Sequence, residues 1–91
     1  MTTEYFSTDA VGNMLQVGDV VVAANRGGSS EVGLGVVSHI TKAGGLRVLY
    51  FDIGTGYDVS RRRFQVVKID NPTTEQRRVA DEMMEIWRNK Q

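Results

Sequence analysis

Two patterns of hydrophobic residues divide the chain near residues 70–72. Before this boundary, short runs of β-branched and aromatic residues are separated by glycine-containing segments, which is typical of β-strands joined by tight turns. The runs predict strands at residues 19–24, 34–41, 46–52, 56–59 and 64–69. After the boundary there is no glycine and apolar residues recur at helical spacing, which predicts a helix over residues 73–90. We therefore expect a mainly β fold with one C-terminal α-helix.

Glycine-rich segments between the runs predict the turns of an antiparallel meander. Residues 43–45 (Ala-Gly-Gly) separate the second and third runs, and residues 54–56 (Gly-Thr-Gly) separate the third and fourth. Glycine lacks a Cβ atom and so adopts the positive φ angles that tight turns require. Residues 26–31 make a longer connection, and we interpret the Arg-Gly-Gly sequence at 26–28 as part of a hairpin loop.

Alternation along residues 46–52 assigns their side chains to two faces of the sheet, because neighbouring residues on a strand point in opposite directions. One face receives Leu46, Val48 and Tyr50, and the other receives Arg47, Leu49 and Phe51. Both faces are largely apolar, whereas a strand exposed to water on one side carries more polar residues. The second face is therefore expected to be covered by the C-terminal helix, by the N-terminal arm or by a partner.

The C-terminal segment has an apolar stripe on one side. Val79, Met83 and Trp87 lie four residues apart, which places them on one face of a helix. An isolated helix of this length is marginal in water, so the stripe must be buried against something. Methionine and tryptophan are common both in cores and at interfaces, so two arrangements stay open. The residues Met83, Met84, Ile86 and Trp87 pack on the chain's own sheet, or they form a homodimer or bind a partner.

Two alternative caps mark the start of this helix. Asn71 can cap a helix that has Pro72 at its first position. Alternatively, Thr73 and Gln76 form a capping box, in which each side chain bonds the backbone N–H of the other residue.

The composition indicates one small domain. The chain has 91 residues, a formal net charge of zero and no cysteine, so disulfides and thiolate zinc sites are excluded. A zero net charge provides no overall field that would draw the chain to nucleic acid or to an anionic membrane. The apolar runs are far shorter than the roughly 20 residues that span a bilayer, and no signal-peptide pattern is present. We divide the chain into an N-terminal arm (1–16), a β-barrel domain (17–70) and a C-terminal helix (71–91), and expect it in the cytoplasm.

Residues 17–40 carry a resemblance to a known fold family. They read as a Gly-Asp turn, an apolar strand, a Gly/Ser loop and a strand that opens on Gly-x-Gly. This layout resembles the KOW and Tudor-like branch of SH3-like barrels, which implies a small barrel of four or five strands that binds other molecules. Residues 35–40 (GVVSHI) match the Gly-x-Val-x-x-Ile half of the KOW motif, but Glu31 and Val32 stand where a basic residue and a glycine are expected. The departure falls in the part of the motif that faces nucleic acid.

The wider layout, over residues 8–69, resembles small bacteriophage accessory proteins. It combines the lead-in DxxGNxLxVGDxV at residues 9–21, the Gly-x-Val strand and the closing QVVKI at residues 65–69. The resemblance implies a protein that binds a host protein and modulates it in the host cytoplasm.

Basic and aromatic side chains provide the candidate contact residues. Three adjacent arginines at 61–63 can grip phosphates or an acidic protein surface, and the alternative is a solvated turn in which they pair with Asp52 and Asp58. Tyr50, Phe51 and Tyr57 form either an aromatic platform or part of the core, and Tyr57 follows a glycine-rich loop. The candidate partner-binding residues are Arg61, Arg62, Arg63, Tyr57, Lys68, Arg47 and Trp87.

Catalytic chemistry finds little support in the sequence. His39 is the only histidine, no serine lies in a motif with a base, and a metal site would depend on carboxylates alone. We therefore expect no enzyme activity, no cofactor and no metal. The leading expectation is a non-enzymatic binding module with a protein partner. The alternative is a KOW-type binder of RNA or DNA, in which the arginine run, Arg47, Lys42 and Lys68 contact phosphates.

Overall fold

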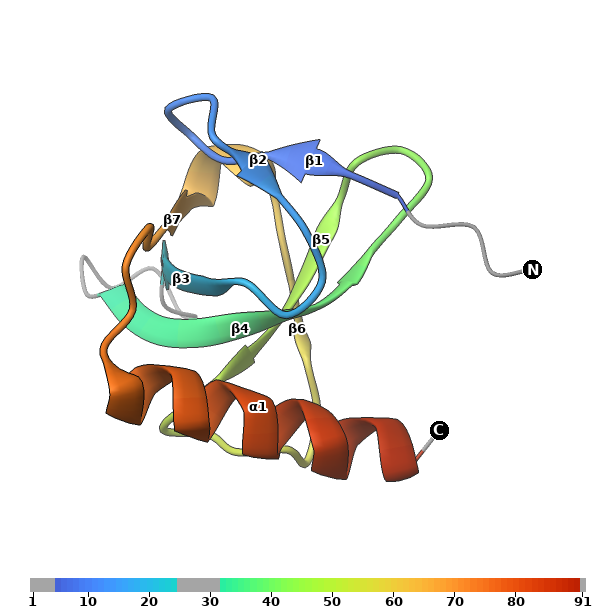
Figure 1. The fold of residues 1–91 in the computed structure, drawn as a ribbon. Coiled ribbons are helices and arrows are strands. Elements are labelled where there is room, and N and C mark those ends of the chain that lie inside the picture. Colours follow the sequence, from blue (N-terminus) through green and yellow to red (C-terminus); the bar gives the residue numbers. More distant parts are fainter. Residues whose placement is uncertain (1–4, 25–31, 91) are drawn as a thin grey trace.

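The computed structural model of the chain describes residues 5–24 and 32–90 (Figure 1). The Arg-Gly-Gly sequence interpreted as a hairpin loop, and Glu31 of the KOW comparison, lie outside these ranges. The strands are β1 (Ser7–Thr8), β2 (Met14–Leu15), β3 (Val20–Ala24), β4 (Val32–Ile40), β5 (Leu46–Tyr50), β6 (Val59–Arg61) and β7 (Val66–Lys68). A 3-10 helix, η1 (Arg63–Gln65), precedes β7, and the α-helix α1 (Thr74–Asn89) follows it. The predicted mainly β fold with one C-terminal helix is confirmed.

Five strands form one antiparallel sheet in the order β6-β5-β4-β3-β7, and β1 and β2 form a separate two-stranded sheet. Strands β3, β4 and β5 each pair with the next strand along the chain, and β7 returns to pair with β3. Figure 1 shows β1 and β2 above one face of the large sheet and α1 along the other face. The sheet is therefore enclosed between the N-terminal hairpin and the C-terminal helix.

The large sheet is open, so the closed barrel that the resemblance implied is not formed. Within the described residues its edge strands β6 and β7 do not pair with each other. Other groups occupy the two edges. The N–H of Ala10 donates to the carbonyl oxygen of Val66 on β7 at 2.9 Å, and the Arg61 side chain donates to the carbonyl oxygen of Ser60 on β6 at 2.8 Å.

The last two predicted strands differ from those observed. After β5, the N–H groups of Ile53 and Gly54 both donate to the carbonyl oxygen of Tyr50, and Gly54 has a φ of +90°. This turn delays the next strand, so β6 begins at Val59 rather than at residue 56. The final strand is shorter than residues 64–69, because Gln65 exchanges hydrogen bonds with the backbone of Arg62 and closes η1 first.

Two apolar clusters pack on opposite faces of the sheet. The inner cluster consists of Leu15, Val21, Ala23, Val37, Ile40, Leu46, Val48, Tyr50 and Val66. The outer cluster joins Val20, Val36 and Leu49 of the sheet to Ala80, Met83 and Met84 of α1. The alternation predicted for β5 is confirmed, and α1 is the element that covers the second apolar face.

Helix α1 begins with the capping box of Thr73 and Gln76. The Gln76 N–H donates to Thr73 Oγ1 at 3.1 Å, and the Gln76 side chain accepts from the Thr73 N–H at 3.0 Å. Of the predicted stripe, Met83 and Met84 are buried and Trp87 is half-buried against the outer cluster. Ile86 is 49% exposed, because it lies at the border of the buried face, on the side of Met83 that is turned away from Met84. The expectation that Ile86 belongs to the buried stripe is therefore wrong.

Gly35 allows β4 to cross close to β5. A Cβ atom at this position would lie 2.6 Å from Val48 Cγ1 and 2.8 Å from the carbonyl oxygen of Leu49. Contacts of this length to backbone atoms do not occur in folded proteins without a shift of one strand. The glycine that opens the Gly-x-Val strand thus has a packing role.

Asp9 connects the N-terminal hairpin to β7. Its carboxylate is fully buried and accepts hydrogen bonds from the N–H groups of Val11 (3.0 Å), Asn13 (2.8 Å) and Lys68 (2.7 Å) and from Asn13 Nδ2 (3.2 Å). Burial acts to raise the pKa of Asp9, but these bonds outweigh it and hold the pKa below its usual value. The carboxylate is therefore ionised in the folded protein at neutral pH.

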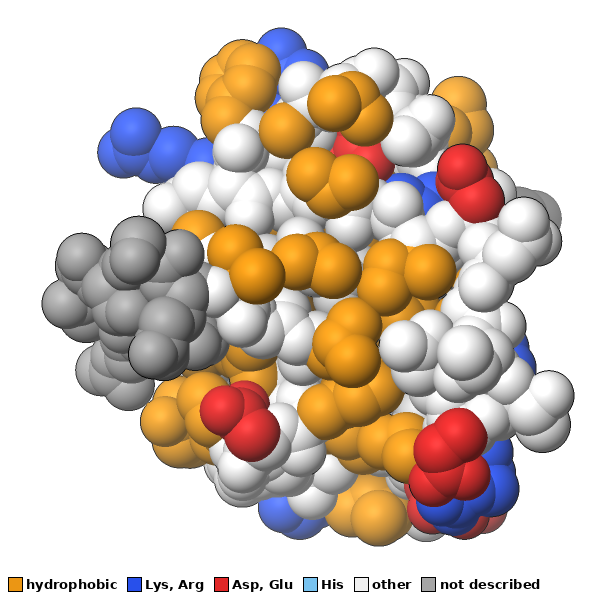
Figure 2. All heavy atoms as spheres, turned by 90° about the vertical axis from the view of Figure 1, so that its left-hand side faces the viewer, with side chains coloured by type: hydrophobic (Ala, Val, Ile, Leu, Met, Phe, Trp, Pro, Cys, Tyr) orange, Lys and Arg blue, Asp and Glu red, His pale blue; other side chains and the backbone are white. Residues whose placement is uncertain are grey.

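Hydrophobic side chains also reach the surface. Figure 2 shows a band of them across the face that lies at the left of Figure 1, where β7, β3 and the start of α1 lie. The cross-strand pair Val22 and Val67 is partly exposed on these strands. An apolar surface of this kind does not select one chemical class of ligand.

Candidate functional site

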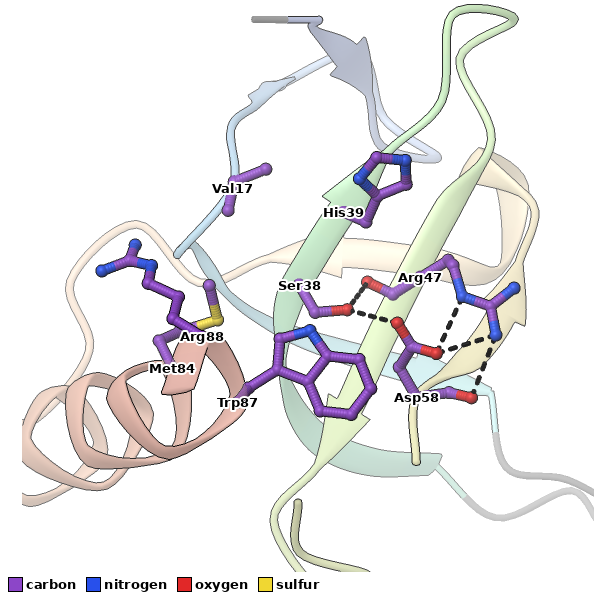
Figure 3. Close-up of a pocket in the computed structure, with 8 residues that line it drawn as sticks. All are labelled: Val17, Ser38, His39, Arg47, Asp58, Met84, Trp87 and Arg88. Carbon is purple, nitrogen blue, oxygen red and sulfur yellow. Dashed lines mark hydrogen bonds and ion pairs between the residues drawn. The ribbon is translucent and has the colours of Figure 1, made fainter. Parts of the chain in front are cut away.

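A pocket of about 460 Å³ lies between the C-terminal half of α1 and the outer face of β4 and β5 (Figure 3). We call it the α1 pocket. Its lining residues are Val17, Ser38, His39, Arg47, Asp58, Met84, Trp87 and Arg88. The volume falls within the range of about 300–1,000 Å³ that is usual for ligand sites.

A β-bulge in β4 brings two adjacent polar residues into this pocket. The register of β4 on β5 shifts between Val37 and His39, so Ser38 is an extra residue on β4. As a result Val37 and Ile40 both enter the inner cluster, while Ser38 and His39 both line the pocket. His39 lies opposite Arg47 in the sheet.

Arg47, Asp58 and Ser38 form a hydrogen-bonded wall on one side of the pocket. Asp58 Oδ1 accepts from Arg47 Nε at 2.8 Å and pairs with Arg47 Nη2 at 2.7 Å, and Asp58 Oδ2 accepts from Ser38 Oγ at 2.9 Å. Burial acts to raise the pKa of Asp58, but the hydrogen bonds from Arg47 and Ser38 hold it below its usual value. The hydrogen bond to Asp58 raises the pKa of Arg47. Both groups are therefore charged at neutral pH, and both carboxylate oxygens already accept hydrogen bonds.

Helix α1 supplies the other walls. Figure 3 shows Arg88 and Val17 on one side of the pocket, Arg47 and Asp58 on the other, and Trp87 between them. Arg88 is exposed and makes no ion pair with any residue in the described ranges. Since Arg47 and Asp58 compensate each other, Arg88 supplies the one excess charge among the arginine and aspartate side chains of the lining.

The loop after β5 joins this site at the end of α1. Lys90 Nζ donates to the carbonyl oxygen of Thr55 at 2.9 Å, which holds the last turn of α1 to the loop that leads into Asp58. Tyr57 belongs to the same loop and is exposed. Of the predicted contact residues, the structure thus brings Arg47 and Trp87 into one pocket and places Tyr57 next to its Asp58 wall.

The three arginines of the predicted cluster do not act together. Arg61 folds over Tyr50: its Nε atom donates to the carbonyl oxygen of Ala24 at 2.8 Å and to Tyr50 Oη at 2.7 Å, and its guanidinium lies 5.6 Å from the ring centroid. The Tyr50 hydroxyl also bonds the Ala24 carbonyl. Nη2 of Arg61 is buried and has no hydrogen-bond acceptor in the described part of the chain. Arg61 therefore stabilises the sheet, and its guanidinium is directed toward Tyr50 and the Ala24 carbonyl oxygen.

Arg62 and Arg63 remain on the surface. The Arg63 guanidinium lies 4.1 Å from the ring centroid of Phe64 and donates to Thr8 Oγ1 at 3.1 Å, and Phe64 is 67% exposed. Lys68 forms a separate contact, an ion pair of 3.8 Å with Asp19. The predicted set therefore divides between the α1 pocket, the Arg63 and Phe64 surface, and Lys68 on β7.

Sequence reasoning missed Val17, Ser38, His39, Met84 and Arg88 as parts of one site. One signal was available for the two on β4. Val37 and Ile40 are three residues apart, so both can reach the core only if the strand departs from strict alternation between them. The contribution of α1 had no local signal, because it depends on where the helix crosses the sheet.

Several other observations bear on the chemistry of the chain. Ser38 bonds Asp58 and the backbone of Arg47, and no hydrogen bond joins it to His39 in the described residues. No three His, Asp or Glu side chains within residues 5–24 and 32–90 are grouped so that they could hold a metal ion. None of the helices in the described ranges combines the length and the apolar character needed to cross a membrane. Comparison with protein-family models, curated proteins and solved structures gives no match.

Proposed function

We propose that this protein is a non-enzymatic binding module that recognises a protein partner through the α1 pocket. The observation that carries the proposal is a concave site, already formed, in which the half-buried Trp87 adjoins the exposed cation of Arg88. Aromatic residues and arginine dominate the binding energy of protein interfaces. The Arg47, Asp58 and Ser38 wall is held by its own hydrogen bonds, so binding needs little reorganisation.

We further propose that the sheet is an open variant of the SH3-like barrel. Its strand order is a four-stranded meander whose fifth strand returns to the first, and a 3-10 helix precedes that fifth strand. This interpretation rests on analogy of fold, and such small barrels serve many functions. In the bacteriophage interpretation, the partner is a host protein in the host cytoplasm, and binding alters its activity by covering a surface.

The KOW-type interpretation, binding of RNA or DNA, is the second candidate function. The observation that favours it is the exposed Phe64 with the Arg63 guanidinium stacked on its ring and Arg62 beside it. Exposed aromatic rings stack on bases, and arginines contact phosphates. This function predicts binding that weakens steeply as salt rises, because bound counterions are released.

Charge reversal at one arginine of each surface separates the two candidates. The tagged full chain is used to recover partners from a bacterial lysate, with and without nuclease, in the wild type and in the variants Arg88→Glu and Arg62→Glu. Both side chains are exposed, so circular dichroism is expected to show unchanged folding. Our proposal predicts a stoichiometric protein that survives nuclease, is retained by Arg62→Glu and is lost by Arg88→Glu.

The opposite pattern supports the second candidate. Loss of the partner with Arg62→Glu or with nuclease, but not with Arg88→Glu, would exclude the α1 pocket as the contact site. Recovery of the same protein partner by all three chains would also contradict our assignment of the pocket.

A further inference from the structure

The charges around the α1 pocket define the chemistry of what it binds. We propose that the pocket takes a carboxylate group of a peptide segment, with an apolar side chain next to that carboxylate. The inference rests on the proposed protein-binding function and specifies its ligand.

An anion is favoured over a cation because the negative group of the pocket is already satisfied. Both oxygens of Asp58 accept hydrogen bonds within the wall, and its side chain is only 10% exposed. Arg88 is exposed without an ion pair in the described ranges, and Arg47 keeps 43% of its side chain exposed. An incoming cation would meet two guanidinium groups and no available carboxylate. An incoming carboxylate would meet the exposed Arg88 guanidinium on one side of the pocket, and the Arg47 guanidinium lies on the other side (Figure 3).

A carboxylate is favoured over a nucleic-acid backbone because of the number of charges. The lining has one excess positive charge, which matches a single carboxylate, whereas a chain of phosphates is bound by several cations in a row. Arginine presents its N–H groups in a planar fork that fits both oxygens of a carboxylate.

The apolar requirement comes from the helix side of the pocket. Val17, Met84 and Trp87 line it with apolar surface next to Arg88. A ligand that offers only charge would leave this surface in water, so an apolar neighbour adds to the affinity by burying it. The expected ligand is therefore a short acidic segment that also carries hydrophobic residues.

Trp87 provides a direct measurement, because it is the only tryptophan in the chain and lies in the pocket wall. Its fluorescence is recorded while the full chain is titrated with pools of leucine-containing hexapeptides. The pools are identical except at one central position, which is Glu, Gln or Lys, and both ends are capped. A fourth pool has Gln at that position and a free C-terminal carboxylate. An oligothymidylate is titrated separately.

The wild-type protein is expected to bind the Glu pool about tenfold more tightly than the Gln pool, as one charge-assisted hydrogen bond provides. Arg88→Glu should abolish this preference, Arg88→Lys should restore part of it, and Arg62→Glu should leave it unchanged. Preference for the free-carboxylate pool instead would support the same chemistry and assign it to a chain terminus.

Other outcomes overturn the inference without removing the proposed function. Equal binding of the Glu and Gln pools, preference for the Lys pool, or no response to any pool would each exclude recognition of a carboxylate. A protein partner that is still lost with Arg88→Glu in the lysate experiment would then show that the pocket binds protein by other means. A response to the oligothymidylate alone would overturn both proposals for this pocket.

Discussion

Replacement of Asp9 by asparagine gives a quantitative test of how the N-terminal hairpin is held to the sheet. Each carboxylate oxygen of Asp9 accepts two hydrogen bonds, all from N–H donors of Val11, Asn13 and Lys68. An asparagine side chain has one oxygen and one NH₂ group. Whichever way it is turned, its NH₂ group faces two donors, so two hydrogen bonds are lost.

The expected loss of stability follows from these two bonds. A hydrogen bond to a charged group contributes about 1.5–3 kcal/mol to the free energy of unfolding. The loss of two such bonds therefore costs at most about 3–6 kcal/mol. In either orientation one of the two affected donors belongs to the exposed Val11 or the half-buried Asn13 and can bond water instead, which lowers the expected loss to about 3 kcal/mol. A domain of this length has a free energy of unfolding of about 5–14 kcal/mol, so the substitution removes a large share of it.

Urea denaturation followed by Trp87 fluorescence measures this loss, and its pH dependence tests the cause. The pKa of Asp9 is lowered in the folded state, so its contribution is present above the unfolded pKa of about 3.9 and is lost as pH falls through the folded value. The difference between the wild type and Asp9→Asn should therefore be about 3 kcal/mol at pH 7 and shrink below about pH 4.

An exposed aspartate on α1 gives the matched control. Asp81 pairs with Arg77 on the same helix and its side chain is 66% exposed. Asp81→Asn should change the free energy of unfolding by no more than about 0.5 kcal/mol. A loss below about 1 kcal/mol for Asp9→Asn at pH 7, or a difference that does not change with pH, would refute the role given to the Asp9 hydrogen bonds.

Three further substitutions test other parts of the fold by the same denaturation assay. Gly35→Ala should cost about 1–3 kcal/mol, because the added methyl group meets the backbone of β5, and a neutral result would mean that β4 can move away freely. Thr73→Ala removes the capping box of α1 and should cost about 1 kcal/mol, whereas no change would assign the helix start to another cap. Arg61→Ala should cost about 1.5–3 kcal/mol, because it removes the hydrogen bonds to the Ala24 carbonyl oxygen and to Tyr50 Oη. The neighbouring Arg62→Ala should change the free energy of unfolding by no more than about 0.5 kcal/mol. Equal effects of the two arginine variants would contradict the division of the arginine run.

The sequence predicted the parts of the fold that depend on local periodicity. Alternation in β5 identified which side chains face each side of the sheet, because the period of two is set by the backbone itself. The sequence left two caps open for α1, Asn71 before Pro72 and the capping box of Thr73. The hydrogen bonds between Thr73 and Gln76 show that the capping box is the one formed. The start of β6 was not predictable in the same way, since the turn at Gly54 uses two N–H groups on one carbonyl oxygen and lengthens the loop.

The candidate site was predictable only in fragments. Arg47 and Trp87 were identified as separate contact residues, but nothing local in either segment indicates that they face each other. Their meeting depends on where α1 crosses the sheet, and on the bulge that turns Ser38 outward. The arginine run shows the reverse case. Three adjacent charges form one cluster in the sequence, yet Arg61 turns inward because Tyr50 and the Ala24 carbonyl offer it partners across the sheet.

The position of α1 in the chain also affects how the protein is made in the cell. The sheet residues Val20, Val36 and Leu49 pack against the helix, which is synthesised after all the described strands. Translation proceeds at about 5–20 residues per second, so the roughly 20 residues from the end of β7 to the end of α1 take about one to four seconds. During that interval the nascent sheet has an uncovered hydrophobic face. A chain whose synthesis stopped before α1 would keep that face exposed, which makes it a substrate for chaperones and proteases.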